Sequence, residues 1–207
     1  MTDYKLTYFD MNAGRGEPLR IAMHIANIQF EDVRWTFSEF SANRNSLRFN
    51  AVPTLEIDGA AFTQSNALSR YIGKMADLYP SDPVQALYCD EVLEALEDLS
   101  HHLVQTFGLE GDEFKAAREK FTDTRLTTFT KGFEELLSRG GGNYFSDNRL
   151  TIADLKMMVT IRSFRSGNLD HVPVDFIDNF TPSLVDFQNR IEQLPQVVAY
   201  YASIKQP

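Results

Sequence analysis

Residues 52–59 of this chain read Val-Pro-Thr-Leu-Glu-Ile-Asp-Gly, and this stretch carries the clearest signal of the fold. Leu55 and Ile57 alternate with polar neighbours, which is the two-residue period of a half-buried strand. The Asp-Gly pair that ends the stretch is a strong signal for a tight turn into a second short strand over 60–63. Because Pro53 lacks an N–H group, it can only open the strand or lie on an edge. The stretch therefore predicts a β-hairpin.

The same region has the features of a peptide-binding edge. The Val52–Pro53 bond precedes a strand in a tight turn, where a cis peptide can be held and the backbone of Val52 turned toward an extended ligand. Gln64 and Ser65 then open a helical pattern, with Ser65 as the expected N-cap. The free amides and the dipole of a helix N-terminus favour anions. These features predict a site for a small peptide with a free α-carboxylate, although a plain hairpin leading into a capped helix accounts for the local pattern equally well.

Size and charge limit the kinds of partner. The chain has 207 residues, of which 43% are hydrophobic and 24% charged, enough for one sizeable core or two modest ones. Its net charge of −9 argues against nucleic acid and against anionic membranes. No segment has the length of a membrane span, and the N-terminus lacks the pattern of a signal peptide. We therefore expect a cytoplasmic protein.

Cysteine and histidine usage makes disulfide and metal chemistry unexpected. The single cysteine, Cys89, excludes an internal disulfide framework and a Cys-x-x-Cys motif. It lies among apolar neighbours in a predicted helix, so we expect a packing residue. The four histidines show no metal-ligand spacing. We expect no bound metal.

The first part of the chain alternates strand and helix signals. Strands are predicted over 5–9 and 30–35, the second with Phe30, Val33 and Trp35 as candidates for burial. A helix with proline in its first turn begins at Glu17. A less regular stretch follows from Ser38 to Phe49, and the hairpin and a helix to about Asp77 complete the unit. Such alternation followed by a hairpin predicts a mixed sheet with helices on its faces.

The rest of the chain reads as helical. The breaker cluster Tyr79-Pro-Ser-Asp-Pro83 is the best linker candidate. Apolar periodicity predicts long helices over 84–107 and 114–137, a glycine loop over 140–143, and two final helices opened by Pro182 and Pro195. Thr151-Ile-Ala-Asp154 has the form of a capping box that starts a buried helix to about Phe164. The fold class is therefore α/β plus all-α, with a small α/β domain at 1–79, a linker at 80–85 and an all-helical domain at 86–207.

Tyr8 is the candidate catalytic residue. It lies near the end of the first strand, and in an α/β unit that end faces the crevice where ligands bind. A phenol there can donate a hydrogen bond to a thiolate, which favours the ionised form and lowers the thiol pKa. A shift of roughly two units would ionise most of a thiol at neutral pH, and the thiolate is the competent nucleophile. The alternative is that Tyr8 is simply an aromatic residue on a strand.

Gly14 and Gly16 form an isolated Gly-x-Gly pair in the loop that follows. This pair is too weak a signal for a dinucleotide-binding motif, and it is better explained as giving the loop flexibility and room for a ligand.

Several motifs together resemble the cytosolic glutathione S-transferases, and most closely the sigma class with the haematopoietic prostaglandin D synthases. They are Tyr4-Lys-Leu-Thr-Tyr-Phe9, Arg15-Gly-Glu-Pro-Leu-Arg20, the stretch 52–59, Gln64-Ser65 with Ser69-Arg-Tyr-Ile72, and Leu150-Thr-Ile-Ala-Asp154. The resemblance covers essentially the whole chain. It implies a thioredoxin-like domain that binds glutathione as co-substrate, an all-helical domain and a homodimer.

The resemblance also implies residue roles. Tyr8 matches the tyrosine that activates the glutathione thiol. Val52 matches the residue whose backbone pairs with the cysteinyl part, before the family's cis-proline, here Pro53. Gln64 and Ser65 match the pair that holds the γ-glutamyl group. Asp98 matches an aspartate that reaches the γ-glutamyl group bound by the other subunit.

The chain departs from the family at the glycyl end of the expected ligand. Phe40 stands where the sigma class usually has a tryptophan, and it lacks the indole N–H donor. Arg44 replaces a common lysine and could compensate with a forked contact. Ala51 replaces a longer polar residue. The loop from Met11 to Arg15 is one residue longer than usual, which leaves the register of Arg15 open.

The main hypothesis is a glutathione transferase whose thiolate attacks an electrophilic carbon. The electrophile is expected between the loop Met11–Gly14 and the first long helix, near Ser100, His101, Val104 and Phe107. A second hypothesis is a glutathione-dependent prostaglandin-H2 D-isomerase that uses the same thiolate on an endoperoxide. A third is a non-catalytic ligandin or lens crystallin on the same fold, against which the retention of Tyr8, Gln64, Ser65 and Asp98 argues.

Overall fold

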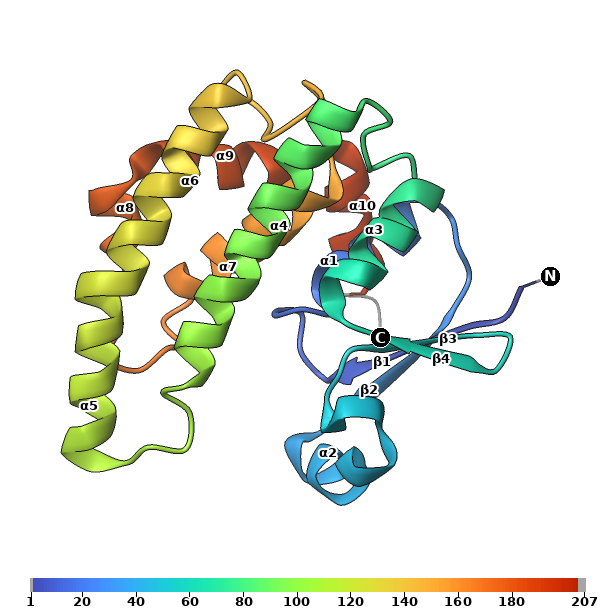
Figure 1. Ribbon diagram of the computed structural model, residues 1–207, viewed down its shortest axis with the longest axis horizontal. Helices are drawn as coiled ribbons and strands as arrows, with labels where there is room; N and C mark the ends of the chain where they lie inside the picture. Colours follow the sequence, from blue (N-terminus) through green and yellow to red (C-terminus); the bar gives the residue numbers. More distant parts are fainter. Residues whose placement is uncertain (1, 205–207) are drawn as a thin grey trace. The chain divides into compact units, whose positions relative to one another are not determined.

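The computed structural model describes residues 2–204. These residues form two compact units. One unit contains the described residues up to Tyr79 together with those from Pro195 onward, and the other contains Pro80–Leu194. Figure 1 traces the elements of each unit along the chain. The predicted fold class, an α/β unit followed by helices, is confirmed.

The first unit is built on a four-stranded mixed sheet in the order β2-β1-β3-β4. Strand β1 runs parallel to β2 and antiparallel to β3, and β3 and β4 form the predicted antiparallel hairpin. Helices α1, α3 and α10 gather on one side of this sheet (Figure 1). The elements of this unit are β1(Tyr4–Phe9), α1(Glu17–Ile25), β2(Glu31–Trp35), α2(Phe37–Asn43), η1(Arg44–Ser46), η2(Arg48–Asn50), β3(Thr54–Ile57), β4(Ala60–Thr63), α3(Ser65–Met75) and α10(Pro195–Ser203).

The core of this unit lies between the central strands and the helices that cover them. Leu6 of β1 faces Leu55 of β3 in the strand register, and both are fully buried. The other large core side chains are Leu19, Ile21, Met23 and Ile72. Burial of such a side chain contributes about 1.5–3 kcal/mol relative to its exposure, so the register of β1 and β3 is strongly fixed.

The burial predicted for the second strand is wrong. Phe30, Val33 and Trp35 are only partly buried. Phe30 lies just before β2 and not in it, and for Val33 and Trp35 the reason is topological, because β2 is an edge strand and has a neighbour on one side only. The irregular stretch that follows β2 contains a short helix, α2. Thr36 is its N-cap and forms a capping box with Glu39. That helix had no counterpart in the predicted elements.

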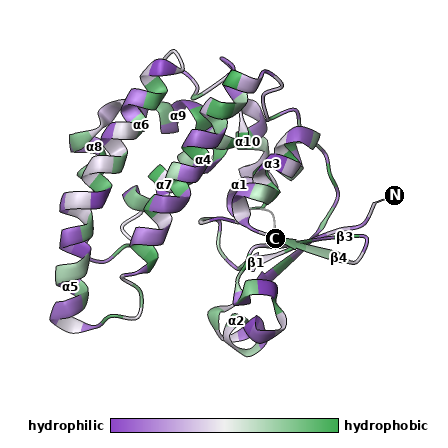
Figure 2. Cartoon of the chain, in the orientation of Figure 1, coloured by the Kyte–Doolittle hydropathy of each residue, from purple (hydrophilic) through white to green (hydrophobic). Residues whose placement is uncertain are grey.

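The second unit is helical. Its elements are α4(Pro83–Val104), α5(Gly111–Lys120), the π-helical segment η3(Phe121–Leu126), α6(Thr127–Arg139), α7(Ile152–Arg165), α8(Phe176–Phe180) and α9(Pro182–Glu192). Apolar and polar positions alternate along α4 and α6 (Figure 2), as expected of helices that bury one face. The predicted long helices are present. The first ends at Val104 rather than near residue 107, and α8 was not predicted.

Helix α4 begins at Pro83, with the carboxylate of Asp82 accepting the N–H groups of Val84 and Gln85. The last helix, α10, packs on α1 within the first unit. The domain boundaries 1–79, 80–85 and 86–207 remain a prediction. Among the helices of residues 2–204, none combines the length and the apolar character needed to cross a bilayer.

The capping box that starts α7 is confirmed. Asp154 accepts hydrogen bonds from the backbone N–H of Thr151 at 2.7 Å, from the Thr151 hydroxyl at 2.6 Å and from the Phe145 N–H at 3.0 Å. Burial nevertheless raises the pKa of the Asp154 carboxyl to about 6, against the opposing effect of these bonds. This carboxyl joins the start of a buried helix to the loop before it.

Candidate active site

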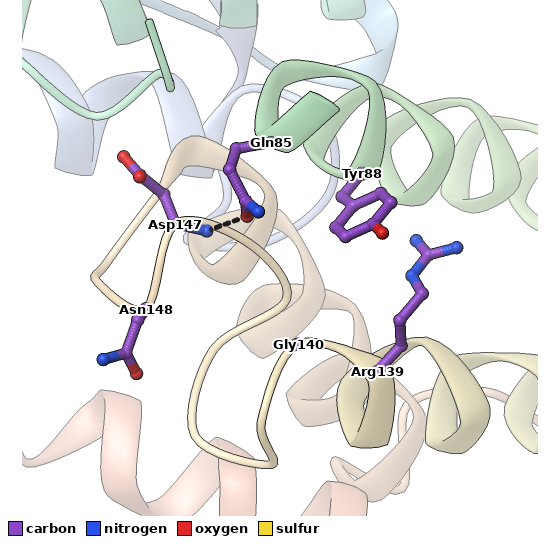
Figure 3. Close-up of a pocket in the computed structure, with 6 residues that line it drawn as sticks. All are labelled: Gln85, Tyr88, Arg139, Gly140, Asp147 and Asn148. Atoms are coloured by element: carbon purple, nitrogen blue, oxygen red, sulfur yellow. Dashed lines mark hydrogen bonds between the residues drawn. The ribbon is translucent and has the colours of Figure 1, made fainter. Parts of the chain in front are cut away.

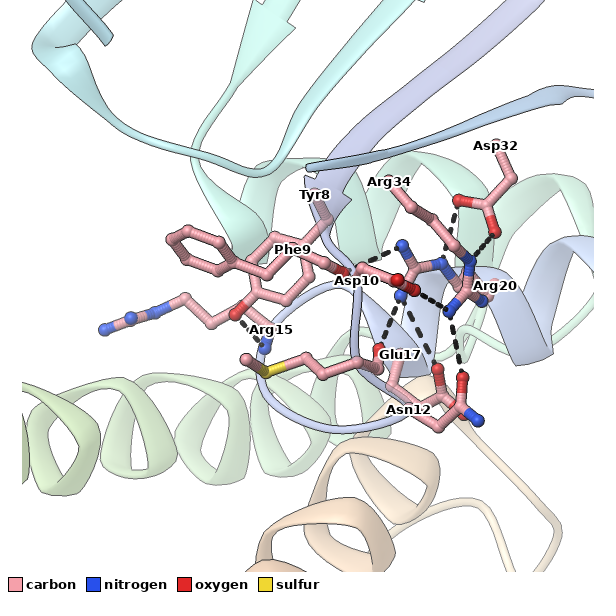
Figure 4. A network of polar contacts seen from close by, with 10 residues as sticks. Tyr8, Phe9, Asp10, Asn12, Arg15, Glu17, Arg20, Asp32 and Arg34 are labelled. Carbon is pink, nitrogen blue, oxygen red and sulfur yellow. Dashed lines mark hydrogen bonds and ion pairs between the residues drawn. The ribbon is translucent and has the colours of Figure 1, made fainter. Parts of the chain in front are cut away.

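Tyr8 lies near the end of β1 and is 5% exposed. Its hydroxyl oxygen accepts the backbone N–H of Arg15 at 3.0 Å, which closes the loop between β1 and α1 over the ring (Figure 4). The ring of Phe9 meets the Tyr8 ring edge-on, with centroids 5.1 Å apart. The Arg20 guanidinium lies 5.9 Å from the centre of the Tyr8 ring. Tyr8 is thus a fixed phenol whose oxygen already receives one donor.

The loop before α1 packs directly against this phenol. Gly14 and Gly16 were expected to give flexibility and room for a ligand. Around both glycines the nearest side-chain atoms belong to Tyr8. The space that these glycines leave is therefore filled by the tyrosine itself.

A buried arginine ties this loop to the sheet. Arg20, on α1, donates to the carbonyl of Met11 at 2.9 Å and to that of Phe9 at 3.3 Å. Its Nε donates to Asp32 on β2 at 2.9 Å, and its Nη1 lies 3.7 Å from the buried carboxylate of Glu17. The arginine is 1% exposed. Figure 4 shows these contacts converging on the guanidinium.

A second arginine extends the network along β2. Arg34 donates to Asp32 at 2.7 Å and to Asn12 at 3.0 Å, and lies 3.4 Å from Asp10. This network has no counterpart among the predictions from the sequence. Its available signal was Arg20, a charged residue within the apolar run Leu-Arg-Ile-Ala-Met of a helix that covers the sheet.

The predicted peptide-binding edge has the expected local structure. The Val52–Pro53 peptide bond is cis. Pro53 is buried, Val52 is partly buried and Ala51 is exposed. Pro53 directly precedes β3, and Val52 lies in the loop just before it. The backbone beside Pro53 is therefore placed at the end of a strand that pairs with β1.

One detail of the neighbouring helix start was wrong. Ser65 is the first residue of α3 and not its N-cap. The N-cap is Gln64, whose backbone has φ 74° and ψ 105° and whose side chain makes no capping bond. This left-handed φ is uncommon for a residue with a side chain. Gln64 is exposed and Ser65 is buried at the positive end of the α3 dipole.

The structure brings two of the predicted glycyl-end residues together. The ring of Phe40 meets that of Phe9 at 5.1 Å, and the Arg44 guanidinium lies 5.5 Å from the Phe40 ring. The ring of Phe37 also packs on Phe9, with centroids 4.8 Å apart. Aromatic residues and one cation thus gather around Phe9, the residue that follows Tyr8 at the end of β1.

The residues predicted on the first long helix lie in the second unit, and their relation to Tyr8 stays a prediction. Asp98 and His101 are exposed on α4, and Ser100 is partly buried. His101 shares a hydrogen bond with Gln105 at 3.1 Å. Val104 ends the helix, and Phe107, just beyond it, is 54% exposed with the Arg118 guanidinium 5.2 Å from its ring.

The second unit also contains a surface cavity of about 260 Å³. It is lined by Gln85, Tyr88, Arg139, Gly140, Asp147 and Asn148 (Figure 3). Arg139 stacks 3.9 Å from the Tyr88 ring and pairs with Glu91 at 2.6 Å. The N–H of Asp147 is taken by Gln85 at 2.6 Å. Arg139 and Gln85 are thus already engaged in contacts at this cavity.

Cys89 has the properties expected of a packing residue. It is fully buried on α4, and burial raises the pKa of its thiol to about 12. Such a thiol is a poor nucleophile at neutral pH. Within residues 2–204, no group of three or more His, Cys, Asp or Glu side chains is placed to hold a metal ion.

Comparison with known proteins agrees with this arrangement. Residues 4–74 match the model of the glutathione S-transferase N-terminal domain, and residues 97–204 match that of the C-terminal domain. Glutathione S-transferase 1 of Ascaris suum is 29% identical over 98% of this chain and 97% of its own. The human hematopoietic prostaglandin D synthase is 28% identical over 95% and 94%. A solved prostaglandin synthase D of Nilaparvata lugens superposes with a TM-score of 0.84 at 25% identity, covering 99% of this chain and 98% of its own.

A thioredoxin-like unit followed by a helical unit is the architecture of the glutathione S-transferases, whose N-terminal and C-terminal domain models this chain matches. The chain belongs to the glutathione S-transferase family. Its membership in this family confirms the predicted glutathione transferase activity.

Proposed function

We propose that Tyr8 stabilises the thiolate of bound glutathione and so makes it a nucleophile at neutral pH. The observation that carries this proposal is the hydrogen bond from the Arg15 N–H to the Tyr8 oxygen at 3.0 Å. A phenol whose oxygen accepts a hydrogen bond becomes a stronger donor through its own O–H, because the bonds polarise one another. The donor then favours the ionised thiol and lowers its pKa.

In the proposed reaction the glutathione sulfur attacks an electrophilic carbon of the second substrate. A carbon–sulfur bond forms with the sulfur electron pair. The thiol proton passes to water when the thiolate forms. In a substitution, the leaving group departs with the electron pair of its broken bond. In an addition, the electron pair of the broken π bond moves to the carbon next to the attacked one, and that neighbouring carbon takes up a proton from water. Tyr8 forms no covalent bond and acts only as a hydrogen-bond donor.

We place the peptide part of glutathione along the edge that begins at Val52. The backbone of Val52 would pair with the cysteinyl residue, and Gln64 and Ser65 would hold the γ-glutamyl carboxylate. The exposed Gln64 at the N-terminus of α3 supports this placement, because that helix end favours an anion. Arg44, near Phe40 at the end of the aromatic cluster, would attract the glycyl carboxylate. Arg15 and Ala51 would add shape and charge at the margin of the site.

Two further proposals concern the site of the second substrate and the sigma class of this transferase. We propose that Met11 and Gly14 on the loop, with Ser100, His101, Val104 and Phe107 in the helical unit, admit the second substrate. We assign the chain to the sigma class on its motifs. Glutathione-dependent isomerisation of prostaglandin H2 is the second candidate activity, and its support is the similarity to the human prostaglandin D synthase.

We further propose a cytoplasmic homodimer that needs no metal ion, with Asp98 reaching the glutathione of the partner subunit. Support for the dimer comes from Phe49, which is 70% exposed and has a φ of 61°. A bulky residue in this conformation is a true outlier, and such strain collects at functional surfaces. Phe62, Tyr71 and Met75 add exposed apolar area in the same unit.

The proposed role of Tyr8 is tested with 1-chloro-2,4-dinitrobenzene as electrophile. Wild type and Tyr8→Phe are compared in glutathione conjugation and in glutathione binding. We expect Tyr8→Phe to bind glutathione but to lose about 100- to 1,000-fold in kcat, the range for removal of one such donor. Equal rates would remove Tyr8 from its role. Turnover of prostaglandin H2 by wild type would favour the isomerase activity, and binding without any turnover would favour a ligandin.

A further inference from the structure

We infer that Gly14 and Gly16 are positioning residues for Tyr8. The loop that carries them approaches the tyrosine so closely that a side chain at either place would displace the phenol. The inference rests on the proposed function of Tyr8 for its effect on catalysis. The contacts themselves stand independently of that function.

Gly16 lies against the root of the tyrosine side chain. A Cβ atom at this position would be 2.4 Å from Cγ and Cδ1 of Tyr8 and 2.8 Å from its Cβ. Carbon atoms in favourable contact are about 3.5–4.0 Å apart, so roughly 1 Å of movement would be needed. The φ of Gly16 is −83°, which any residue adopts. Glycine is therefore required here by the neighbouring ring and not by the backbone.

Gly14 lies against the other end of the same side chain. A Cβ atom there would be 2.5 Å from the Tyr8 hydroxyl oxygen, while the ring carbons Cε1 and Cζ are at 3.4 Å. The conflict is therefore with the hydroxyl alone. Gly14 also has a φ of +67°, where a side chain adds strain. These two costs can be separated, since only the first depends on the hydroxyl.

The tyrosine has little room to retreat. The residue is 5% exposed, its ring meets that of Phe9 edge-on, and its oxygen accepts the Arg15 N–H at 3.0 Å. A displaced hydroxyl would lose this bond, because hydrogen bonds weaken steeply with distance and angle. A misplacement of about 1 Å at a reacting centre can cost about 100-fold in rate. The two glycines therefore fix where the donor for the thiolate stands.

The first experiment measures conjugation of 1-chloro-2,4-dinitrobenzene by Gly14→Ala and Gly16→Ala as a function of pH. We expect kcat to fall about 10- to 100-fold for each variant, the KM for glutathione to change little, and the apparent pKa of the bound thiol to rise. The matched controls are Gly132→Ala for an ordinary φ and Gly167→Ala for a φ of +76°, since an added Cβ meets nothing within 4 Å at either place. An unchanged thiol pKa in both loop variants would overturn the inference.

The second experiment does not depend on activity. The thermal unfolding midpoint is measured for Gly14→Ala in wild type and in the Tyr8→Phe variant, which lacks the hydroxyl. In the wild-type background, we expect Gly14→Ala to lower the unfolding midpoint by more than Gly167→Ala does. In the Tyr8→Phe background, we expect Gly14→Ala to lower the midpoint only as much as Gly167→Ala does. Gly16→Ala should lower the midpoint equally in both, because it meets the ring and not the hydroxyl.

The two experiments separate the inference from the proposed function. Equal losses for Gly14→Ala in the two backgrounds would overturn the close contact with the hydroxyl and leave the role of Tyr8 standing. A different result is also informative. If Gly14→Ala destabilises wild type more than the Tyr8→Phe variant, but Tyr8→Phe conjugates as fast as wild type, the proposed role of Tyr8 is wrong. The catalytic part of this inference is then wrong as well.

Discussion

Arg20 donates from its Nε to Asp32 at 2.9 Å while its own side chain is 1% exposed. A buried guanidinium needs such a partner, because an unpaired buried charge is costly. Here the pairing connects α1 to the edge strand β2, and the remaining N–H groups hold the carbonyls of Phe9 and Met11. The arginine therefore links the packing of the first unit to the loop that closes over Tyr8.

Arg20→Met should destabilise the protein and disturb the loop. The variant leaves two carbonyls and the Glu17 carboxylate without the guanidinium, so we expect a loss of about 3–5 kcal/mol in the free energy of unfolding. Chemical denaturation measures it. Arg149→Met is the control, because Arg149 is 37% exposed and also pairs with an aspartate. A loss for Arg20→Met no larger than that of the control would contradict the structural role given to Arg20.

The capping box of α7 should be more important for stability than that of α2. Asp154→Ala leaves the N–H groups of Phe145 and Thr151 without their acceptor in a fully buried setting, and we expect a loss of about 2–5 kcal/mol. Glu39→Ala removes the equivalent carboxylate of the exposed box of α2 and should cost much less. Urea denaturation of both variants compares them. Equal losses of unfolding free energy for the two variants would show that burial of a capping box does not determine its contribution to stability.

Asp154 should also make stability depend on pH. Burial raises the pKa of this carboxyl from 3.8 to about 6 in the folded protein, so the folded state binds its proton more tightly than the unfolded state. The contribution is therefore fully present below about pH 4 and is lost as pH rises through about 6. The change is about 3 kcal/mol, taking 1.36 kcal/mol for each pKa unit.

The measurement is the difference in unfolding free energy between wild type and Asp154→Asn, which cannot ionise, across this pH range. Wild type should lose stability relative to the variant as the pH increases. A difference that stays constant, or that moves in favour of wild type, would show that the hydrogen bonds to Asp154 outweigh its burial.

Cys89 should be unreactive in the folded protein. Its thiol is fully buried and burial raises its pKa to about 12, so little thiolate is present or accessible at neutral pH. Ellman's reagent should report no free thiol in buffer and one per chain in concentrated urea. Ser81→Cys, at an exposed position before α4, should add one thiol that reacts in buffer. Rapid reaction of wild type in buffer would mean that α4 opens locally.

Phe49 should control the state of association. If the exposed ring is covered by a second copy, light scattering of wild type should give twice the chain mass of 23.6 kDa. Phe49→Asn keeps a residue that tolerates a φ of 61° but removes the aromatic surface, and it should shift the protein toward the monomer. Val174→Asn, also at an exposed apolar position, is the control. A wild-type monomer with full activity would contradict the dimer and the proposed role of Asp98.

The sequence alone determined those features that have local causes. The hairpin follows from alternation and an Asp-Gly turn, the start of α7 from a Thr and an Asp three residues apart, and the starts of α9 and α10 from their prolines. Each signal involves residues within a few positions of one another, so the chain states it directly. Recognition of the family rested on such local motifs combined.

Only the tertiary structure decided what surrounds the candidate catalytic phenol. The sequence suggested Tyr8, but its neighbours Gly14, Gly16 and Arg20 are brought to it by the pairing of strands and by the packing of α1, which no local pattern states. The same holds for Trp35, whose partial exposure depends on β2 being at the sheet edge. Burial and close approach depend on how the chain folds in three dimensions, and the spacing of residues along the sequence does not state them.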